Sequence, residues 1–332
     1  LYTNRVMTFM MPALMIIMNV MSILIVWISA HRIDDGVMEV GTMTAFITYT
    51  MMIVMAFLML TMISIMLPRA GVAADRIDEV LKTEVSVNNS TDAVDAGRSK
   101  GVVRFNHVSF AYPEAEGKVL DDIDFEASPG TTTAIIGSTG CGKSTLVNLI
   151  PRFFDVTEGS ITLDGRDIRN ITLESLRENI GYVPQKGILF SGTIADNIKY
   201  GQQEESDEDM LEAAEIAQAT EFIEAKPDKY ESQVAQGGNN VSGGQKQRLS
   251  IARAIARDPM IYIFDDSFSA LDFKTDAALR KALAPKVKDK TVLIVAQRIS
   301  TVMHAEQIIV LDDGKVAGIG THKGLMENCE IY

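Results

Sequence analysis

The sequence predicts an α/β domain with a mostly parallel sheet, preceded by an all-α membrane segment of two helices. Three observations support this prediction. Two long runs near the start of the chain contain no Asp, Glu, Lys or Arg. From residue 102 onwards, short apolar runs alternate with helix-like stretches. One glycine-rich loop stands between such a strand and such a helix, which is the arrangement of a phosphate-binding loop.

Composition excludes several classes of protein. The chain has 332 residues, which is long enough for about two domains. Its net charge of −13 argues against a nucleic acid partner. Cys141 and Cys329 are its only cysteines, and two cysteines so far apart do not suggest a disulfide framework or a metal site. We therefore expect a reducing, cytosolic setting for the globular part.

The two charge-free runs, Val6–Ala30 and Val40–Leu67, are predicted membrane spans. Each exceeds the roughly 20 residues that cross a hydrocarbon core about 30 Å thick. A cleaved signal peptide would have one shorter apolar core, and a buried hairpin of a soluble protein is the other alternative. The loop 31–39 carries one Arg and three acids, whereas basic residues flank the outer ends: Arg5, Arg69, Arg76 and Lys82.

Positive residues stay on the cytoplasmic side of a membrane, so both chain ends are expected in the cytoplasm. The protein is then an integral protein of the plasma (inner) membrane, in contact with lipid, with its globular domain in the cytoplasm. Helical spacing over 70–82 predicts that the second span continues beyond Pro68 as a cytosolic helix. Ser, Asn, Asp and Gly dominate 84–100, which predicts a linker. The expected division is 1–83 for the membrane segment, with spans at about 6–30 and 40–67, then 84–100 for the linker and 101–332 for the globular domain.

Periodicity places the elements of the globular domain. Val102–Tyr112 alternates like a strand, and Leu120–Phe125 is its expected hairpin partner. Further strands are expected at 133–136, 161–163, 180–184, 261–265, 291–296 and 307–311, and helices at 144–150, 172–178, 207–219, 243–257 and 273–283. Few strand signals occur in 194–257, which predicts a helical subdomain over about 190–257. Ser206 is a possible cap for the helix at 207, where the acidic run 204–209 meets a positive helix end.

The loop between the strand at 133 and the helix at 144 reads Gly-Ser-Thr-Gly-Cys-Gly-Lys-Ser-Thr. It fits the pattern Gly, four residues, Gly-Lys-Ser/Thr, whose glycines aim backbone N–H groups at phosphate oxygens beside a positive helix end. The alternative is a glycine-rich turn that binds nothing, but the correct flanks argue against it. The residues expected to bind a nucleotide triphosphate are Gly137, Ser138, Thr139, Gly140, Cys141, Gly142, Lys143, Ser144 and Thr145. Lys143 would reach the β- and γ-phosphates, and Ser144 would offer its hydroxyl to magnesium.

Two further stretches have the chemistry of such a site. Ile261–Asp265 is an apolar strand that ends in a carboxylate, and in phosphate-loop proteins an acid at this place holds magnesium. Upstream of it, Val241-Ser-Gly-Gly-Gln-Lys-Gln-Arg248 places Ser-Gly-Gly at the start of a helix, an arrangement that binds anions. The second stretch would be a weak signal by itself.

Together and in this order, these stretches resemble the ATPase domain of ABC transporters. With the two spans before it, the chain resembles the C-terminal part of an exporter-type half-transporter. Such a membrane domain has six spans, so four more are expected before Leu1, and the chain looks like a fragment. The resemblance implies a P-loop ABC ATPase domain with a helical subdomain, ATP and Mg²⁺ as cofactors, a second half-transporter as partner and a transported substrate that the sequence does not identify.

The resemblance also implies roles for single residues. Tyr112 matches the aromatic residue that stacks on adenine, and Gln185 matches the glutamine that touches magnesium and couples to the membrane domain. Asp272 lies in a loop that crosses the dimer interface in the family. In such dimers two ATP molecules are sandwiched head to tail, so the signature of one chain caps the ATP of the other. The matching signature residues are Ser242, Gly243, Gly244 and Gln245.

Two positions depart from the family pattern. Asp266 follows the magnesium residue Asp265, where active members have a glutamate that polarises the attacking water. Asp is one methylene shorter, and a displacement of about 1 Å can cost about 10²-fold in rate. Gln297 stands where the family has a histidine that contacts the γ-phosphate, and an amide cannot carry the charge of an imidazolium. Asp266, Gln297 and Gln185 are therefore the expected catalytic residues of a site that turns ATP over slowly, if at all.

The leading interpretation is the degenerate-site subunit of a heterodimeric ABC exporter of the multidrug or lipid type. Its intact signature would complete a catalytic site on the partner. One alternative is a homodimeric exporter in which Asp266 is a weak base. Another is a nucleotide-gated regulatory subunit of a channel or receptor, without transport. An importer is disfavoured, because common importers keep the ATPase and the spans on separate chains.

Overall fold

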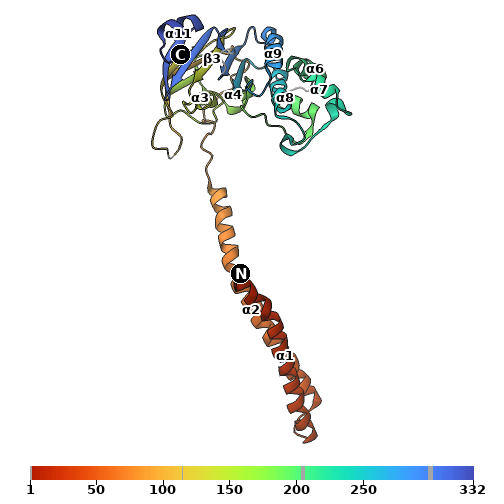
Figure 1. Cartoon of the computed structure of the whole chain (residues 1–332). Coiled ribbons are helices and arrows are strands. Elements are labelled where there is room, and N and C mark those ends of the chain that lie inside the picture. Colours follow the sequence, from red (N-terminus) through yellow and green to blue (C-terminus); the bar gives the residue numbers. More distant parts are fainter. Residues whose placement is uncertain (1, 114, 203–205, 298–301) are drawn as a thin grey trace. The chain divides into compact units, whose positions relative to one another are not determined.

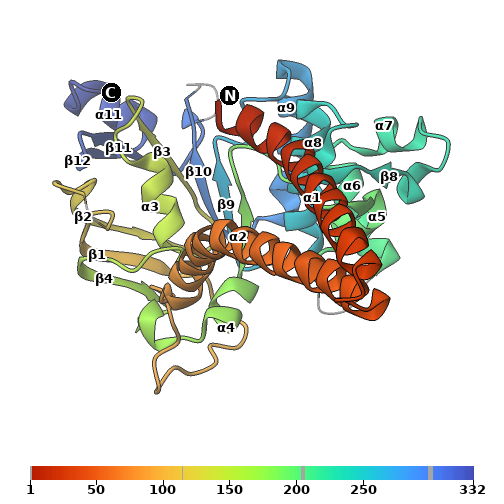
Figure 2. The same ribbon diagram turned by 90° about the horizontal axis from the view of Figure 1, so that it is seen from below.

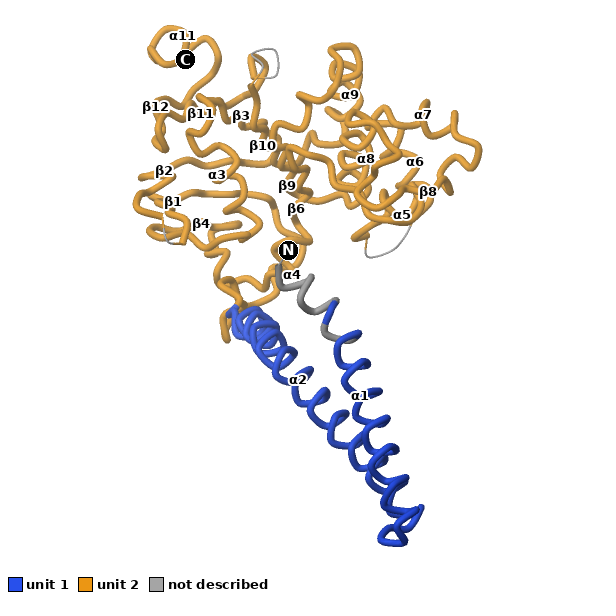
Figure 3. The backbone as a smooth tube through the Cα atoms, turned by 60° about the horizontal axis from the view of Figure 1, so that its bottom comes forward, with its two compact units in different colours: residues 1–84 blue, residues 85–332 orange. Residues whose placement is uncertain are grey.

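The computed structural model describes residues 2–113, 115–202, 206–297 and 302–332 (Figure 1). It divides into two compact units, residues 1–84 and 85–332, which Figure 3 shows in different colours. We describe each unit by itself.

The first unit is a pair of long helices, α1 (Tyr2–Asp34) and α2 (Val40–Lys82). Both are long and apolar enough to cross a membrane, and neither buries an appreciable part of its apolar surface within the chain. Helix α2 continues through Pro68 without a break, so the predicted extension over 70–82 is confirmed. Five hydroxyls of α2 donate to carbonyl oxygens one turn earlier, as Thr61 Oγ1 does to Phe57 at 2.8 Å, which satisfies them without water.

The second unit contains a six-stranded sheet in the order β12-β11-β3-β10-β9-β6, in which only β12 runs antiparallel. The fold class predicted from the alternating strands and helices is therefore confirmed. The strands are β3 (Thr132–Gly137), β6 (Ile180–Val183), β9 (Ile261–Asp265), β10 (Thr291–Val295), β11 (Gln307–Asp312) and β12 (Lys315–Gly320). The helices α3 (Lys143–Leu149), α4 (Leu173–Glu178), α9 (Phe273–Lys286) and α11 (His322–Asn328) accompany this sheet.

A second, antiparallel sheet has the order β2-β1-β4-β5, and its hairpin of β1 and β2 was predicted. Its strands are β1 (Val103–Phe110), β2 (Leu120–Ala127), β4 (Glu158–Leu163) and β5 (Arg166–Asp167). This sheet lies on one side of the unit, and the helices of the region predicted to be a helical insert gather on the other side (Figure 2).

The insert contains α5 (Ile194–Lys199), α6 (Asp207–Ile216), α7 (Thr220–Glu224) and α8 (Gly243–Ala256). It also contains a small sheet of β7 (Gly192–Thr193) and β8 (Gln233–Val234), whose strands are too short to produce an alternating pattern. Short 3₁₀ turns are formed by Ile168–Asn170, Lys229–Glu231 and Gln236–Gly238. The predicted cap is confirmed, since the Ser206 side chain accepts from the N–H of Asp209; residues 204 and 205 of the acidic run lie outside the described residues.

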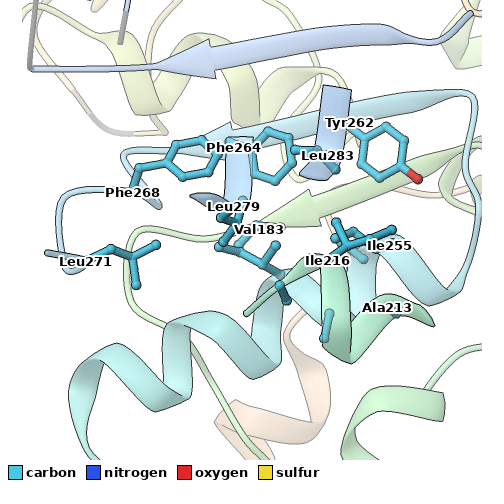
Figure 4. Close-up of a cluster of buried hydrophobic side chains, with 14 of the residues drawn as sticks. Val183, Ala213, Ile216, Ile255, Tyr262, Phe264, Phe268, Leu271, Leu279 and Leu283 are labelled. Atoms are coloured by element: carbon cyan, nitrogen blue, oxygen red, sulfur yellow. The ribbon is translucent and has the colours of Figure 1, made fainter. Parts of the chain in front are cut away.

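Two apolar clusters cover the two faces of the six-stranded sheet. Successive residues of β9 alternate between them: Tyr262 and Phe264 face α8 and α9, whereas Ile261 and Ile263 face the cluster that contains α3 and the antiparallel sheet. Figure 4 shows the first cluster. Burial on both faces explains why the parallel strands read as continuous apolar runs.

Truncation of a core side chain in the first cluster should destabilise the second unit. Leu279 on α9 is 0% exposed, and Leu279→Ala should cost about 2–5 kcal/mol because it leaves a cavity. Thermal unfolding followed by calorimetry should show a midpoint lowered by at least about 4 °C. Leu211→Ala on α6, where the side chain is 48% exposed, is the matched control and should change the midpoint little. Equal shifts for the two variants would contradict the assignment of Leu279 to the core.

Candidate nucleotide-binding site

The predicted phosphate loop lies between the carboxyl end of β3 and the first turn of α3. Gly137, Gly140 and Gly142 all have positive φ angles, of 151°, 87° and 97°. A Cβ atom on Gly142 would lie 2.8 Å from Leu120 Cδ2 and 3.1 Å from the carbonyl oxygen of Val119. A Cβ atom on Gly137 would collide with the carbonyl oxygen of Leu311. Glycine is therefore required at both ends of the loop for steric as well as conformational reasons.

Lys143 is folded back onto the loop that it follows. Its side chain is largely buried, and Nζ donates to the carbonyl oxygens of Gly137 at 2.9 Å and Ser138 at 2.6 Å. Nζ also lies 3.6 Å from Sγ of Cys141, which is 5% exposed and packs in the core beneath the loop. Cys141 thus supports the loop from below, while Lys143 places a positive charge at its centre.

A hydroxyl and a carboxylate meet next to this charge. Ser144 Oγ donates to Oδ1 of Asp265 at 2.9 Å, and the Tyr182 hydroxyl lies 3.4 Å from Oδ2. Burial raises the pKa of the Asp265 carboxyl, and the hydrogen bonds from Ser144 and Tyr182 oppose this shift. Burial also raises the pKa of the Tyr182 hydroxyl, so Tyr182 remains a hydrogen-bond donor. The oxygens of Ser144 and Asp265 are hard ligands of the kind that Mg²⁺ prefers, so these residues fit a magnesium ion.

The three expected catalytic residues converge on one oxygen atom. Oδ2 of Asp266 accepts from Gln297 Nε2 at 3.0 Å and from Gln185 Nε2 at 3.3 Å. Asp266 is 8% exposed and has a φ of 46°, a left-handed conformation that is uncommon for a residue with a side chain. Its N–H donates to the carbonyl oxygen of Val295 on β10, which helps to hold this conformation.

These groups line a single pocket of about 230 Å³. Its lining consists of Val119, Thr139, Gly140, Gly142, Lys143, Ser144, Thr145, Gln185, Asp265, Asp266, Val295 and Gln297. The fold therefore brings together groups that are distant in the sequence: the phosphate loop, the end of β9 and the two glutamines. A larger cavity of about 510 Å³, between residues 95–98 and 256–260, contains none of them.

Other predicted site residues lie outside the pocket lining. The hydroxyl of Tyr112 is 3.0 Å from Thr145 Oγ1, which places the ring beside the loop, edge-on to Phe154. Asp272 caps α9, and its carboxylate accepts from the N–H groups of Lys274 and Thr275. Its interactions in this chain are therefore those of a helix cap.

The signature residues form the start of α8, also outside the pocket. The Ser242 side chain accepts from the N–H of Gln245, and the Gln245 side chain accepts from the N–H of Ser242, which is a capping box. Gly243 and Gly244 form the first turn of the helix between them. The four signature residues therefore do not line the pocket of the chain that carries them.

Two residues that were not predicted from the sequence, Tyr182 and Gln247, support the site. The single hydroxyl proton of Tyr182 is shared between two acceptors, Asn148 Oδ1 on α3 at 2.8 Å and Asp265 Oδ2 at 3.4 Å. Gln247, 2% exposed, accepts from the N–H of Gly187 and donates to the carbonyl oxygen of Pro184, so it holds the segment that carries Gln185 against α8. A polar residue on the buried face of a predicted helix was the available signal for Gln247.

Comparisons with known proteins all find ABC transporters. Residues 120–269 match the sequence model of a family described as ABC transporter. An uncharacterized ABC transporter ATP-binding protein of Mycobacterium bovis is 48% identical, over 97% of this chain and 56% of that protein. A putative multidrug export ATP-binding/permease protein of Bacillus subtilis is 38% identical, over 92% of this chain and 53% of that protein. The chain spans little more than half the length of these curated relatives.

A solved structure, described as a bacterial Atm1-family ABC exporter with ATP bound, is similar with a TM-score of 0.74 and 31% sequence identity. The similarity covers 94% of this chain and 54% of that chain. It therefore includes the two apolar helices as well as the α/β unit.

The geometry at Gly142 predicts a loss of nucleotide binding on substitution. Gly142→Ala adds a Cβ against Leu120 and Val119 at a left-handed φ, so the loop must shift. We expect binding of a fluorescent ATP analogue with Mg²⁺ to weaken by at least about tenfold, which corresponds to about 1.4 kcal/mol. Gly117→Ala is the control, because a Cβ there would have no heavy atom within 4 Å. Unchanged affinity in Gly142→Ala would rule out this loop as the binding site.

Proposed function

The chain carries an ABC transporter ATP-binding domain preceded by two long apolar helices, and we propose that it is the degenerate-site subunit of a heterodimeric ABC exporter. The proposal rests on the surroundings of Asp266, which by the family resemblance stands where active members have a water-polarising glutamate. Its Oδ2 already accepts hydrogen bonds from two amides, those of Gln297 and Gln185. The chain would bind ATP and Mg²⁺ firmly but contribute little hydrolysis at its own pocket.

The residues of the pocket, together with Tyr112 beside it, would bind the nucleotide as follows. The N–H groups of the phosphate loop hold the phosphates, and Tyr112 stacks on the adenine. Lys143 exchanges its bonds to Gly137 and Ser138 for bonds to phosphate oxygens. Ser144, Asp265 and Gln185 would hold Mg²⁺, which supplies neutralisation of charge on the β- and γ-phosphates when it is bound.

Hydrolysis in this pocket lacks two contributions. The Asp266 carboxylate is one methylene shorter than glutamate, and two donors already occupy one of its oxygens. Gln297 donates to that same oxygen and is neutral, so it cannot supply a positive charge to the γ-phosphate. A water molecule in the attacking position would have neither a well-placed base nor a charged partner.

The signature residues support a role toward a second chain. Ser242 to Gln245 are ordered by their own capping box and lie outside the pocket of the chain that carries them. Their Ser-Gly-Gly turn at a helix start is suited to the phosphates of an ATP molecule held by a partner subunit. Asp272 would keep the loop 269–272 in place at the same interface. An intact signature beside a degenerate pocket favours a heterodimer over a homodimer.

We further propose the arrangement of the whole subunit. Residues 1–83 would be the last part of the exporter membrane domain, 84–100 the linker, and 101–332 the ATP-binding domain, with a helical subdomain over about 190–257. The ATP-binding domain would lie in the cytoplasm beneath the plasma membrane. The putative multidrug export relative is consistent with an exporter, and the transported compound is not specified by these residues.

Neutralisation of Asp266 distinguishes the heterodimer hypothesis from the alternative of a homodimer that uses Asp266 as its base. In the transporter assembled with its partner, Asp266→Asn should leave phosphate release within about twofold of the wild-type rate. The homodimer alternative predicts loss of activity on the same change. Release of inorganic phosphate from ATP, measured in nanodiscs with both proteins at equal expression, is the readout.

Restoration of the family residues should create activity in a chain that lacks it. The full-length chain alone should hydrolyse ATP negligibly, whereas the double variant Asp266→Glu with Gln297→His should gain about 10²-fold. Adding Lys143→Ala to the double variant is the control and should remove this gain. Rapid turnover by the wild-type chain alone would contradict the proposal.

A further inference from the structure

The linker after the second helix is bonded along its length to α4. The N–H of Leu173 donates to Asn89 Oδ1 at 2.8 Å. The N–H of Thr172 donates to the carbonyl oxygen of Val94 at 3.0 Å, and the N–H of Val94 donates to that of Asn170 at 3.0 Å. Its composition predicts only a linker, but here its side chains and backbone find partners on α4 and on the residues that flank this helix.

Two buried polar side chains of the α4 region fix the end of the linker. Ser175, 4% exposed, accepts from the N–H of Ala96 at 2.9 Å and donates to Asp95 Oδ1 at 2.6 Å. Asn179, 5% exposed, accepts from the N–H of Ser99 at 2.8 Å and donates to the carbonyl oxygen of Gly97 at 2.8 Å. Because both side chains are buried, separating the linker from them would leave unpaired polar groups.

Helix α4 is bonded in turn to the chain that follows the phosphate-loop helix. Arg177 donates from Nε to the carbonyl oxygen of Pro151 and from Nη2 to that of Arg152, both at 3.0 Å. The guanidinium also lies over the ring of Phe153 at 5.7 Å. Helix α3 ends at Leu149, so Arg177 holds the first residues after the helix that carries Lys143 and Ser144.

A second connection runs from the linker to the same place. Arg152 is 2% exposed, and its guanidinium binds both carboxylate oxygens of Asp155, at 2.7 and 2.9 Å. The same guanidinium donates to the carbonyl oxygen of Asn88 in the linker at 3.3 Å. The linker therefore contacts the end of α3 directly as well as through α4.

These contacts continue to the magnesium residues. The ring of Phe153 packs edge-on against Tyr182 with 5.5 Å between centroids, and the Tyr182 hydroxyl reaches Asp265. Linker, α4, the end of α3 and Asp265 thus form an unbroken series of packed and hydrogen-bonded groups. The segment 83–84 joins this series covalently to α2.

We propose that Arg177 is a positioning residue that couples the linker 84–100 to the phosphate-loop helix, so that ATP binding and the state of the linker depend on each other. The inference rests on the proposed function, since it takes Gly137 to Thr145 as the ATP-binding loop. Coupling between two sites is reciprocal, so ATP in the pocket must change the stability of the linker contacts.

Hydrogen exchange measures this coupling in the full-length transporter in lipid nanodiscs. Binding of ATP with Mg²⁺ should slow exchange at the amides of Val94, Ala96 and Ser99 by about fivefold or more. Arg177→Lys keeps the charge but loses the planar fork that binds two carbonyl oxygens, so it should abolish this response. The control is the same change at Arg169, which binds Asp167 and should leave the response intact.

Each outcome is decisive. A fluorescent ATP analogue first establishes that the wild-type chain binds nucleotide, and absence of binding would overturn the proposed function itself. Binding without any change in linker exchange would overturn the coupling alone. A full response in Arg177→Lys, or an equal loss in Arg169→Lys, would overturn the role of Arg177. Asn179→Ala, which frees the linker from the other end of α4, should reproduce the loss if Arg177→Lys does not fold.

Discussion

The α/β unit depends on close backbone packing at two glycines, Gly142 and Gly314, where its two sheets meet. A Cβ atom on Gly142 would press on Leu120 and Val119 at the start of β2. Gly314, between β11 and β12, packs against the carbonyl oxygen of Val119 in the same way. The antiparallel sheet can therefore approach the end of the parallel sheet only because these positions have no side chain. That approach closes the pocket on the side of Val119.

This junction concentrates charge in a confined space. Lys143, Asp265 and Asp266 are all less than a tenth exposed, and buried charges are stable only when they are paired or hydrogen-bonded. The chain satisfies them internally: Lys143 by two carbonyl oxygens, Asp265 by two hydroxyls, Asp266 by two amides. A nucleotide can displace the first set readily, because phosphate oxygens are better acceptors for a cation than neutral carbonyls. Phosphate oxygens are acceptors, so they offer no replacement for the two amides that donate to Asp266.

The sequence predicted those features that depend on local pattern. Strands buried on both faces appear as apolar runs, and the phosphate loop appears as fixed residue types at fixed spacing, so both could be located without a structure. Strand β12 could not, because its exposed edge position leaves a weak pattern with two glycines. The convergence of Gln185 and Gln297 on Asp266 was also beyond reach, since it joins residues 81 and 31 positions apart through side-chain orientation. The contacts of the linker could not be predicted for the same reason, because composition does not reveal the partners Ser175 and Asn179.

The signature turn and the catalytic side of the pocket are stabilised by different kinds of contact, so a substitution can affect one without the other. The signature turn is ordered by bonds between Ser242 and Gln245, three residues apart, so its geometry does not depend on what stands at Asp266 or Gln297. The catalytic side of the pocket instead depends on the relative positions of β9, β10 and the segment after β6, which carry Asp266, Gln297 and Gln185. Substitution there can therefore alter the catalytic side of the pocket without disturbing the hydrogen bonds that order the signature turn. A division of labour between two subunits is therefore compatible with this fold without any rearrangement of its core.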